Sequence, residues 1–275
     1  LGDVYKRQYL IMGTDKTGAD SKVYQGSMSD FLMLVIVDKT DNNYSFLPIN
    51  RDTMSEVRLI QDDGTGAATA ELQLCTAHWY GGNAGQSCAN TVESISKLFG
   101  GLKIDGYYAI PMDEIPKLNH SVGGVTVTLL EDFQDIDRQM KKGETLALSD
   151  EQAYHYIHDR YGVGDEKNTS RMKRQQQYME AFFTKAKEKA KSDKAYVSQL
   201  FRKFEQTATT NLTVKKISGL TNRLIKGTQK GFFEIQGTSK IGKALGDGID
   251  HAEFYPDKES IIDVMTKIYG LKKRK

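Results

Sequence analysis

Apolar and polar positions alternate between strand-like runs and helical stripes through the first two-thirds of the chain. Apolar runs predict strands over residues 9–12, 31–37 and 44–49, and an apolar-polar alternation after Gly123-Gly124 predicts another over residues 125–130. The second run is apolar at every position, which is typical of a strand covered on both faces of its sheet. These runs predict the strands of the fold.

Several segments carry helical signals. Residues 90–99 have apolar residues at helical spacing and end at Gly100-Gly101. Ser149-Asp-Glu-Gln152 is a capping-box pattern that predicts a helix through about residue 159, and Ser170 predicts the start of a longer helix to about residue 191. Because strands alternate with helices, the sequence predicts a layered α/β fold.

The C-terminal third has a weaker pattern. From about residue 205, glycine, threonine and lysine become frequent, and only a final helix near residues 260–269 stands out. The opening residues 1–8 fit no periodic pattern, and we interpret them as an assembly scar outside the fold. The sequence therefore predicts a single domain over residues 9–275, with a less regular part from about residue 205.

Composition limits the classes of function. With 39% apolar and 27% charged residues, the chain is typical of a globular protein with a buried core. A net charge of +2 does not indicate a polyanion partner, so any anion site must come from local arrangement. No apolar run reaches the roughly 18 residues of a membrane span, and a signal or anchor helix would precede this chain. Cys75 and Cys88 fit either a disulfide or two buried thiols.

Charged side chains gather at the ends of the predicted strands. Asp15 follows the first strand, Asp30 precedes the second, and Asn50-Arg51-Asp52 follows the third. Ligands of α/β folds sit at the carboxyl ends of strands, so we expect these side chains to lie together. Two carboxylates with few other protein ligands suit Mg²⁺, although a single aspartate in such a place is more often a turn former.

The long predicted helix carries a basic face. This face holds two arginines with two polar neighbours, at Arg171, Arg174, Gln175 and Tyr178. The arginines repel each other, and they lie in the first turns, where the helix dipole disfavours cations and attracts anions. A phosphate bound by both arginines would resolve these conflicts, and a solvated basic face is the alternative.

Other kinds of catalytic motif are missing from the sequence. His155 and His158 lie on a predicted helix without the spacing of a metal site, and we interpret them as structural. The sequence contains no Gly-x-Ser-x-Gly elbow, P-loop or Cys-x-x-Cys pair. It therefore gives no support to a covalent nucleophile.

A series of segments between about residues 9 and 183 resembles, in order and spacing, the motifs of the LytR-CpsA-Psr family. These segments are Gly13-Thr-Asp15, Ser29-Asp30, Pro48-Ile-Asn-Arg-Asp52, Ala77-His-Trp-Tyr-Gly-Gly82, Val122-Gly-Gly-Val-Thr-Val127, Glu151-Gln-Ala-Tyr-His-Tyr-Ile-His-Asp-Arg160 and Arg171-Met-Lys-Arg-Gln-Gln176. No single motif is decisive. Their shared order makes the resemblance specific.

The resemblance implies a fold and an activity. The fold would be an α-β-α arrangement with a central mixed β-sheet flanked by helices and a hydrophobic tunnel for a polyprenyl tail. The activity would be that of an extracytoplasmic, membrane-associated phosphotransferase that uses Mg²⁺. It would move a glycopolymer, such as a teichoic acid or a capsular polysaccharide, from a polyprenyl pyrophosphate carrier onto peptidoglycan and release polyprenyl phosphate.

The resemblance also implies roles for individual residues. Asp15 and Asp30 would hold the metal. The pyrophosphate would be bound by four arginines and a glutamine, at Arg51, Arg160, Arg171, Arg174 and Gln175. Arg51, Asp52 and Asp165 would be catalytic, with the two aspartates organising arginines or accepting a proton.

Several positions depart from the family pattern. Three cationic positions of the family are occupied here by Met28, Gln73 and His158. Cys75 replaces an asparagine. Asn168 replaces the aspartate three positions before the helix arginine, a role that Asp165 would take over. Because a hydrogen bond to a charged group contributes about 1.5–3 kcal/mol, we expect weaker pyrophosphate binding.

Rival functions follow from the same residues. The losses at Met28, Gln73 and His158 suit a non-catalytic binder of polyprenyl phosphates, and water as acceptor would make the protein a lipid pyrophosphatase. The net charge of +2, with no helix-turn-helix or aromatic RNA-binding motif, disfavours a nucleic-acid-binding regulator. We therefore expect no nucleic-acid partner.

Overall fold

The computed structural model describes residues 5–15, 26–61 and 66–270 of the chain. The chain divides into two compact units: unit 1 comprises Leu1–Ala109 and Thr209–Lys275, and unit 2 comprises Ile110–Ala208. The pattern of the sequence predicts one domain and gives no sign of this division. Within the described ranges, no helix is long and apolar enough to cross a membrane.

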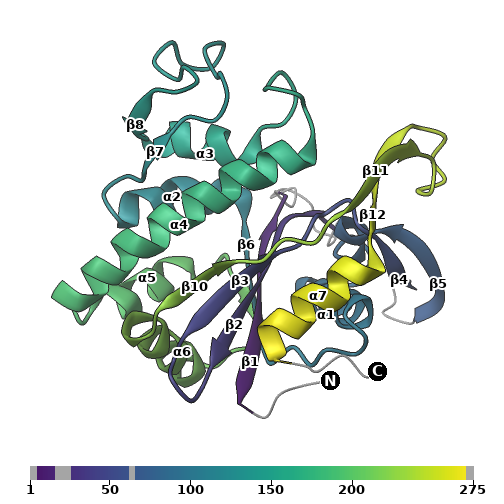
Figure 1. Cartoon of the computed structure of the whole chain (residues 1–275), viewed down its shortest axis with the longest axis horizontal. Coiled ribbons are helices and arrows are strands. Elements are labelled where there is room, and N and C mark those ends of the chain that lie inside the picture. Colours follow the sequence, from purple (N-terminus) through teal and green to yellow (C-terminus); the bar gives the residue numbers. More distant parts are fainter. Residues whose placement is uncertain (1–4, 16–25, 62–65, 271–275) are drawn as a thin grey trace. The chain divides into compact units, whose positions relative to one another are not determined.

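A six-stranded mixed sheet forms the centre of unit 1, with the strand order β10-β3-β2-β1-β6-β9 (Figure 1). Its strands are β1 (Lys6–Thr14), β2 (Ser29–Asp38), β3 (Tyr44–Pro48), β6 (Gly106–Pro111), β9 (Thr209–Thr210) and β10 (Gln229–Phe232). β2 runs antiparallel to both β1 and β3, whereas β10 runs parallel to β3. The predicted α/β fold with a central mixed sheet flanked by helices is confirmed.

β2 is buried on both faces, as its continuous apolar run predicts. On one face, Leu32, Leu34 and Ile36 belong to the main core cluster. On the other face, Met33, Val35 and Val37 are each 1% exposed. Successive side chains of a strand point to opposite faces, so this burial requires covering layers on both sides. The helices α1 (Ala84–Leu98) and α7 (Lys258–Tyr269) cover the first face.

β1 begins within the segment that the sequence analysis places outside the fold. Lys6 is its first residue, and Nζ of Lys6 lies 2.6 Å from Oδ2 of Asp38. The backbone N–H of Gln8 donates to Asp105 at 3.0 Å. The interpretation of residues 6–8 as a scar is therefore wrong, because polar side chains at this end hide the strand from an apolar pattern. Residues 1–4 lie outside the described residues.

Further hairpins and helices of unit 1 complete its described part. The hairpins are β4 (Met54–Ile60) with β5 (Gly66–Gln73), and β11 (Gly237–Gly242) with β12 (His251–Pro256). A short 3-10 helix η1 (Leu74–Ala77) follows β5, and α6 (Val214–Lys226) precedes β10. α1 begins at Ala84 rather than at residue 90, because Asn83 caps it by accepting from the N–H of Gln86 at 3.0 Å.

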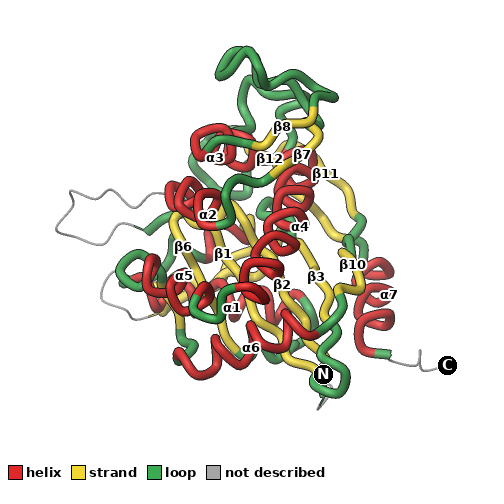
Figure 2. The backbone as a smooth tube through the Cα atoms, turned by 90° about the vertical axis from the view of Figure 1, so that its left-hand side faces the viewer, coloured by secondary structure: helices red, strands yellow, loops and turns green. Residues whose placement is uncertain are grey.

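Unit 2 is mainly helical, and its elements are shown in Figure 2. It contains η2 (Met112–Glu114), α2 (Ile115–Ser121), α3 (Asp150–His158), α4 (Asn168–Ser192), α5 (Tyr196–Phe204) and the paired strands β7 (Thr126–Thr128) and β8 (Thr145–Ala147). The capping box at the start of α3 is confirmed, with Ser149 and Gln152 bonding each other's N–H groups. α4 begins two residues before the predicted Ser170, and Lys167 takes the N-cap position.

Candidate functional site

The end of β1, the start of β2 and the end of β3 meet at one edge of the sheet. This follows from the antiparallel pairing of β2 with both neighbours. The backbone N–H of Asp15 donates to the carbonyl of Met28 at 2.9 Å, which joins the first two segments. Asp15, Asp30 and Arg51 therefore lie at the same edge, Asp30 because β2 runs antiparallel to both of its neighbours.

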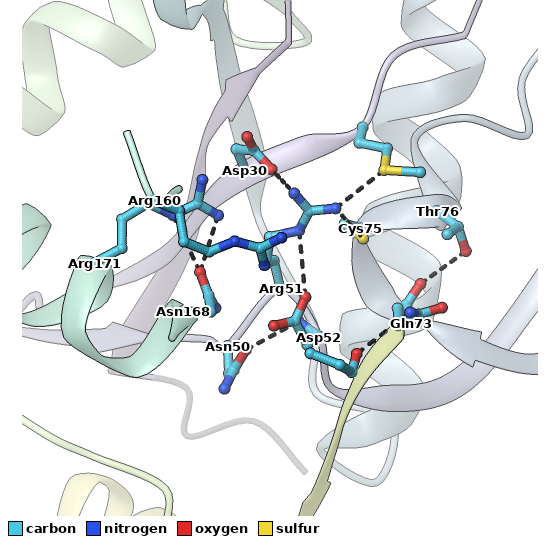
Figure 3. A network of polar contacts seen from close by, with 12 residues as sticks. Asp30, Asn50, Arg51, Asp52, Gln73, Cys75, Thr76, Arg160, Asn168 and Arg171 are labelled. Atoms are coloured by element: carbon cyan, nitrogen blue, oxygen red, sulfur yellow. Dashed lines mark hydrogen bonds and ion pairs between the residues drawn. The ribbon is translucent and has the colours of Figure 1, made fainter. Parts of the chain in front are cut away.

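Arg51 is the centre of a charged cluster at this edge (Figure 3). Its NH1 pairs with Oδ1 of Asp30, and its Nε lies 3.5 Å from Oδ1 of Asp52. The Arg51 side chain is 14% exposed and that of Asp30 only 7%. Burial opposes the charged guanidinium, but the carboxylates of Asp30 and Asp52 raise the pKa of Arg51. Arg51 is therefore a fixed cation held between carboxylates.

Two sulfur atoms lie against the remaining nitrogen of Arg51. Its NH2 is 3.0 Å from Sδ of Met28 and 2.9 Å from Sγ of Cys75. Burial raises the pKa of the Cys75 thiol to about 11, so the thiol is neutral at pH 7. Cys75 and Cys88 are both buried thiols rather than a disulfide. Met28 and Cys75, both departures from the family pattern, therefore contact the same nitrogen. Sulfur is a weak hydrogen-bond acceptor, so they hold this nitrogen only weakly.

The backbone around Arg51 is fixed on both sides. The carbonyl oxygens of Arg51, Asp52 and Thr53 accept from the N–H groups of Cys75, Phe254 and Leu74 at 2.9, 2.8 and 2.8 Å. The side chain of Asn50 accepts from the N–H of Asp52 at 2.9 Å. Gln73 donates to the carbonyl of Ala252 at 3.3 Å and so ties β5 to β12. The position where the family has a lysine therefore serves packing here.

Asp15 and Asp30 are the candidate metal ligands of unit 1. One carboxylate oxygen of Asp15 lies within 4.8 Å of one from Asp30. Mg²⁺ binds oxygen ligands at 2.0–2.1 Å, so two ligands of one ion lie at most about 4 Å apart. The limit of 4.8 Å on the separation of these two oxygens is close to that value. The donor set of two carboxylates therefore fits a divalent cation.

Arg171 in unit 2 is buried, with 3% of its surface exposed. Its Nε and NH2 donate to Oδ1 of Asn168 at 3.2 and 2.9 Å (Figure 3). Its NH1 donates to the carbonyl of His158 at 3.2 Å. Arg174, on the same face, is 1% exposed. The alternative of a solvated basic face is therefore wrong.

Arg174 and Gln175 hold the C-terminal end of α3. Arg174 donates from NH1 and NH2 to the carbonyls of Tyr156 and Asp159 at 2.7 and 2.6 Å, and Gln175 donates to the carbonyl of Ile157 at 3.0 Å. Nε of Arg174 lies 2.9 Å from Oε2 of Glu131. The last carbonyls of a helix need such donors. Arg174 and Gln175 therefore direct these donors to the protein itself, and their assignment to the pyrophosphate stays a prediction.

Asp159 lies between two histidines. Nδ1 of His155 is 2.7 Å from one of its oxygens, and Nδ1 of His158 is 3.0 Å from the other. Burial opposes the charge of this carboxylate, but the hydrogen bonds from both histidines lower the pKa of Asp159. His158 also stacks on Tyr154 with ring centroids 4.7 Å apart. These contacts hold both imidazoles against the carboxylate of Asp159.

Arg160 lies in the loop between α3 and α4. Its NH2 donates to the hydroxyl of Tyr161, and its guanidinium lies 4.6 Å from the centroid of that ring. Arg160 is half-buried, whereas Tyr161 is 76% exposed. Three arginines of unit 2 are predicted to bind pyrophosphate, and Arg160 is more exposed within its unit than Arg171 or Arg174.

Asp165 lies in the same loop, three residues before the start of α4. Hydrogen bonds from the Ser170 side chain and the Lys167 N–H lower the pKa of Asp165, and the latter bond measures 3.1 Å. Asn168, rather than Asp165, contacts the guanidinium of Arg171. The prediction that Asp165 takes the place of the missing aspartate is therefore wrong, because the helix begins at Asn168 itself.

Two buried residues support the unit 1 cluster without having been assigned to it from sequence. Nδ1 of His78 lies 2.8 Å from the carbonyl of Ser27, just before β2. Asn90 donates to the carbonyls of Arg58, Ala77 and Tyr80 at 2.9, 2.8 and 2.9 Å. Asn90 is 2% exposed, and a buried asparagine in a helix needs hydrogen-bond partners of this kind.

Comparison with known proteins gives one family match. The model of the LytR_cpsA_psr family matches residues 6–268, which is most of the chain. Comparison with curated proteins finds no significant match.

Solved structures share the fold over nearly the whole chain. TagV of B. subtilis is 22% identical, with a TM-score of 0.72, over 98% of this chain and 99% of that one. Protein gbs0355 from Streptococcus agalactiae is 21% identical, with a TM-score of 0.74, over 98% and 90%. TagT bound to LI-WTA is 19% identical, with a TM-score of 0.67, over 98% and 92%. At these identities the likeness shows the fold alone.

Proposed function

Because the chain belongs to the LytR-CpsA-Psr family, we propose that it moves a glycopolymer from a polyprenyl pyrophosphate carrier onto peptidoglycan. Family membership supports the coarser role of a cell-wall glycopolymer transferase. The carrier, the acceptor and the use of Mg²⁺ are parts of our proposal. A wall-teichoic-acid type of polymer is favoured by the neighbours described as TagT bound to LI-WTA and to LIIa-WTA.

The proposal includes a location. Proteins of this family are typically extracytoplasmic, and we place the reaction on the outer side of the cell membrane. Both substrates would meet there, since the carrier is a membrane lipid and the acceptor is the wall. Anchoring of the protein to that membrane belongs to the same proposal.

One observation carries the proposal: Arg51 is a largely buried cation between Asp30 and Asp52, at the sheet edge where Asp15 also lies. A guanidinium binds phosphate oxygens in a fixed geometry when its own orientation is fixed. The carboxylates of Asp15 and Asp30 supply hard oxygen ligands for a divalent cation. Such a cation would also take phosphate oxygens into its coordination shell. A fixed guanidinium, that of Arg51, beside a site for a divalent metal ion suits the binding of a pyrophosphate.

The residues of the chain have separate tasks in this proposal. Mg²⁺ bound by Asp15 and Asp30 would neutralise charge on the pyrophosphate. Arg51 would bind a phosphate oxygen and remain oriented by its carboxylate partners. The family pattern, rather than the geometry, adds Arg160, Arg171, Arg174 and Gln175 of unit 2 as further pyrophosphate ligands.

The reaction would be a displacement at phosphorus. The oxygen of an acceptor hydroxyl bonds to the glycan-side phosphorus, the bond from that phosphorus to the bridging oxygen breaks, and polyprenyl monophosphate leaves. The hydroxyl proton passes to solvent, because the carboxylates of Asp30 and Asp52 are engaged with Arg51. Catalysis of such a transfer rests on positioning and charge stabilisation.

A second function has its own observation. Met28 places a neutral sulfur against Arg51, and Gln73 donates to a backbone carbonyl, so neither residue adds a cation to the cluster. A protein with this weaker charge could bind a polyprenyl pyrophosphate and release it without transfer. The second candidate is therefore a non-catalytic binder of such lipids.

One reaction distinguishes these functions. The protein is incubated with Mg²⁺, a lipid-pyrophosphate-linked glycan and soluble peptidoglycan chains, and the products are identified by mass spectrometry. Our proposal predicts a glycan–peptidoglycan phosphodiester together with polyprenyl phosphate. A glycan phosphate without the adduct would indicate a pyrophosphatase. Bound but unchanged lipid would indicate the non-catalytic binder and refute transfer.

A further inference from the structure

A polar pocket of about 320 Å³ lies in unit 2, where α4 ends and α5 begins. Its lining includes Lys189 and Ser192 of α4, and Tyr196, Gln199, Leu200 and Lys203 of α5. Figure 2 shows both helices. Ligand sites commonly have volumes of about 300–1,000 Å³, so this pocket has room for a group of the size of one sugar phosphate or polyol phosphate.

The pocket is rich in hydrogen-bond donors. Nζ of Lys189 donates to the carbonyl of Ser121, the last residue of α2, at 3.1 Å, which fixes this ammonium at the wall. The hydroxyl of Tyr196 lies 3.3 Å from Oγ of Ser121. Burial raises the pKa of Tyr196, so its hydroxyl stays protonated. Ammonium, hydroxyl and amide donors together suit a ligand with several oxygen acceptors.

The charges of the lining favour an anion that also carries hydroxyl groups. Lys189 and Lys203 are two cations against one carboxylate, Asp193, which leaves a net charge of +1. Oδ1 of Asp193 accepts from the N–H of Ala195 at 2.8 Å, and its other oxygen can accept from a ligand hydroxyl. A phosphate with neighbouring hydroxyls would satisfy both signs of charge.

The last turns of α4 and the loop that follows it are rich in lysine. Lys185, Lys187, Lys191 and Lys194 lie there beside one further acidic residue, Glu188. Burial and the charge of Lys191 lower the pKa of Lys187, as expected where like charges stand close together. Lysines near a helix C-terminus are favoured by the helix dipole whatever they bind, so the pocket rather than the number of lysines supports a site.

The surroundings of the pocket distinguish between kinds of polyanion. Large apolar side chains that are exposed in the described part of the chain occur elsewhere, and none lies on α4 or α5. A membrane-surface site inserts such side chains into lipid, and a single-strand nucleic-acid site stacks bases on exposed aromatic rings. The pocket has neither feature, which favours a phosphate-bearing glycan.

We propose that this pocket binds one phosphodiester-linked sugar or polyol unit of an anionic glycopolymer. The source of that polymer rests on the proposed function. Lys189 lies 18 residues after Arg171 on the same helix, about 27 Å along its axis. The pocket is therefore distinct from the pyrophosphate ligands, and a polymer engaged at Arg171 would need to span about that length to reach it.

A titration followed by amide NMR shifts tests the pocket directly. The probe is a synthetic glycerol phosphate trimer, with inorganic phosphate and phosphatidylglycerol vesicles as separate arms. We expect shifts concentrated at the end of α4 and in α5. The double variant Lys189→Gln/Lys203→Gln should weaken binding at least about tenfold, since each lysine supplies a charged hydrogen bond. The matched control Lys215→Gln/Lys216→Gln, on α6, should bind like the wild type.

Several outcomes would overturn the proposal. One is that the trimer causes no shifts; another is that it shifts residues near all lysines and the control variant weakens binding as much as the pocket variant does. The others are that inorganic phosphate binds as tightly as the trimer, or that only the vesicles cause shifts. The trimer should still bind to Arg171→Ala, because the pocket does not contain Arg171. Trimer binding without glycan transfer would support the pocket and refute the proposed function. Glycan transfer without trimer binding would support the proposed function and refute the pocket.

Discussion

Oδ1 of Asn168 accepts hydrogen bonds from both Nε and NH2 of Arg171, at 3.2 and 2.9 Å. The two residues are one turn apart at the start of α4, so the helix itself sets this geometry. An amide oxygen orients a guanidinium without neutralising it, whereas the aspartate of the family pattern would do both. Asn168 thus keeps Arg171 oriented while leaving its positive charge uncompensated by this partner.

Asn168→Asp should therefore stabilise the protein at neutral pH. A charged hydrogen bond contributes about 1 kcal/mol more than a neutral one, so the free energy of unfolding should rise by roughly that amount. Arg171 would hold the pKa of the new carboxylate below its unfolded value of about 3.9, so the gain exists above pH 4 and is lost as the pH falls further. Urea unfolding from pH 7 to pH 3 measures it. Equal stability at pH 7 would contradict the pairing, and Asn222→Asp on α6 is the control.

Arg174→Met should destabilise unit 2 strongly. The variant leaves the carbonyls of Tyr156 and Asp159 without these donors and Glu131 without its ion pair. Breaking a buried ion pair by removing one partner costs on the order of 3–5 kcal/mol. Chemical unfolding measures the loss, with the exposed Arg202→Met as the matched control. A loss below about 1 kcal/mol in Arg174→Met would refute the structural role.

Met28→Arg should strengthen pyrophosphate binding. The new guanidinium would lie beside Arg51, where the wild type places a neutral sulfur 3.0 Å from NH2. A charged hydrogen bond of about 1.5–3 kcal/mol corresponds to a gain in affinity of roughly ten- to a hundredfold. Calorimetry with geranylgeranyl pyrophosphate and Mg²⁺ provides the comparison. The control Thr40→Arg adds the same charge at an exposed position. An equal gain in pyrophosphate affinity for this control would show a non-specific charge effect instead.

The pairing of Lys6 with Asp38 gives stability a specific pH dependence. Burial works against the charge of Asp38, but hydrogen bonds from Lys6 and Thr40 lower the pKa of Asp38 to about 2. The folded pKa thus lies below the unfolded value of about 3.9, so this stabilisation is present above about pH 4 and is lost as the pH falls toward 2. Asp38→Asn and Lys6→Met should each be less stable than the wild type at pH 6. Denaturant unfolding should show that this difference in unfolding free energy shrinks as the pH falls from about 4 toward 2. A Lys6→Met variant with wild-type stability throughout would mean that residue 6 does not support the fold.

Local patterns predicted the parts of the fold that depend on neighbouring residues. The continuous apolar run of β2 and the capping box of Ser149 were both found from sequence, because each signal lies within a few residues. The start of β1 was missed because its partners, Asp38 and Asp105, lie far along the chain. α6 was missed although Thr213 caps it and Ile217 packs inward, since lysine and glycine dilute its apolar spacing.

The site was predictable to a similar extent. The sequence placed Asp15, Asp30 and Arg51 at strand ends, but the antiparallel pairing of β1, β2 and β3 that brings them to one edge came only from the structure. The role of Arg174 was not predictable, because it depends on where the last carbonyls of α3 lie in space. The link between Gln73 and Ala252 spans 179 positions, beyond the reach of any local pattern.

The central claim is that the chain binds a polyprenyl pyrophosphate with Mg²⁺ through its arginines. Thermal unfolding with and without a synthetic polyprenyl pyrophosphate and Mg²⁺ tests it on the wild type, Arg171→Ala, Arg160→Ala and the control Arg202→Ala. We predict a Mg²⁺-dependent rise in Tm for the wild type and the control, lost in Arg171→Ala and reduced in Arg160→Ala. Arg160→Ala keeps the test valid if Arg171→Ala does not fold. No rise for the wild type, or an equal rise in both site variants, would contradict the account.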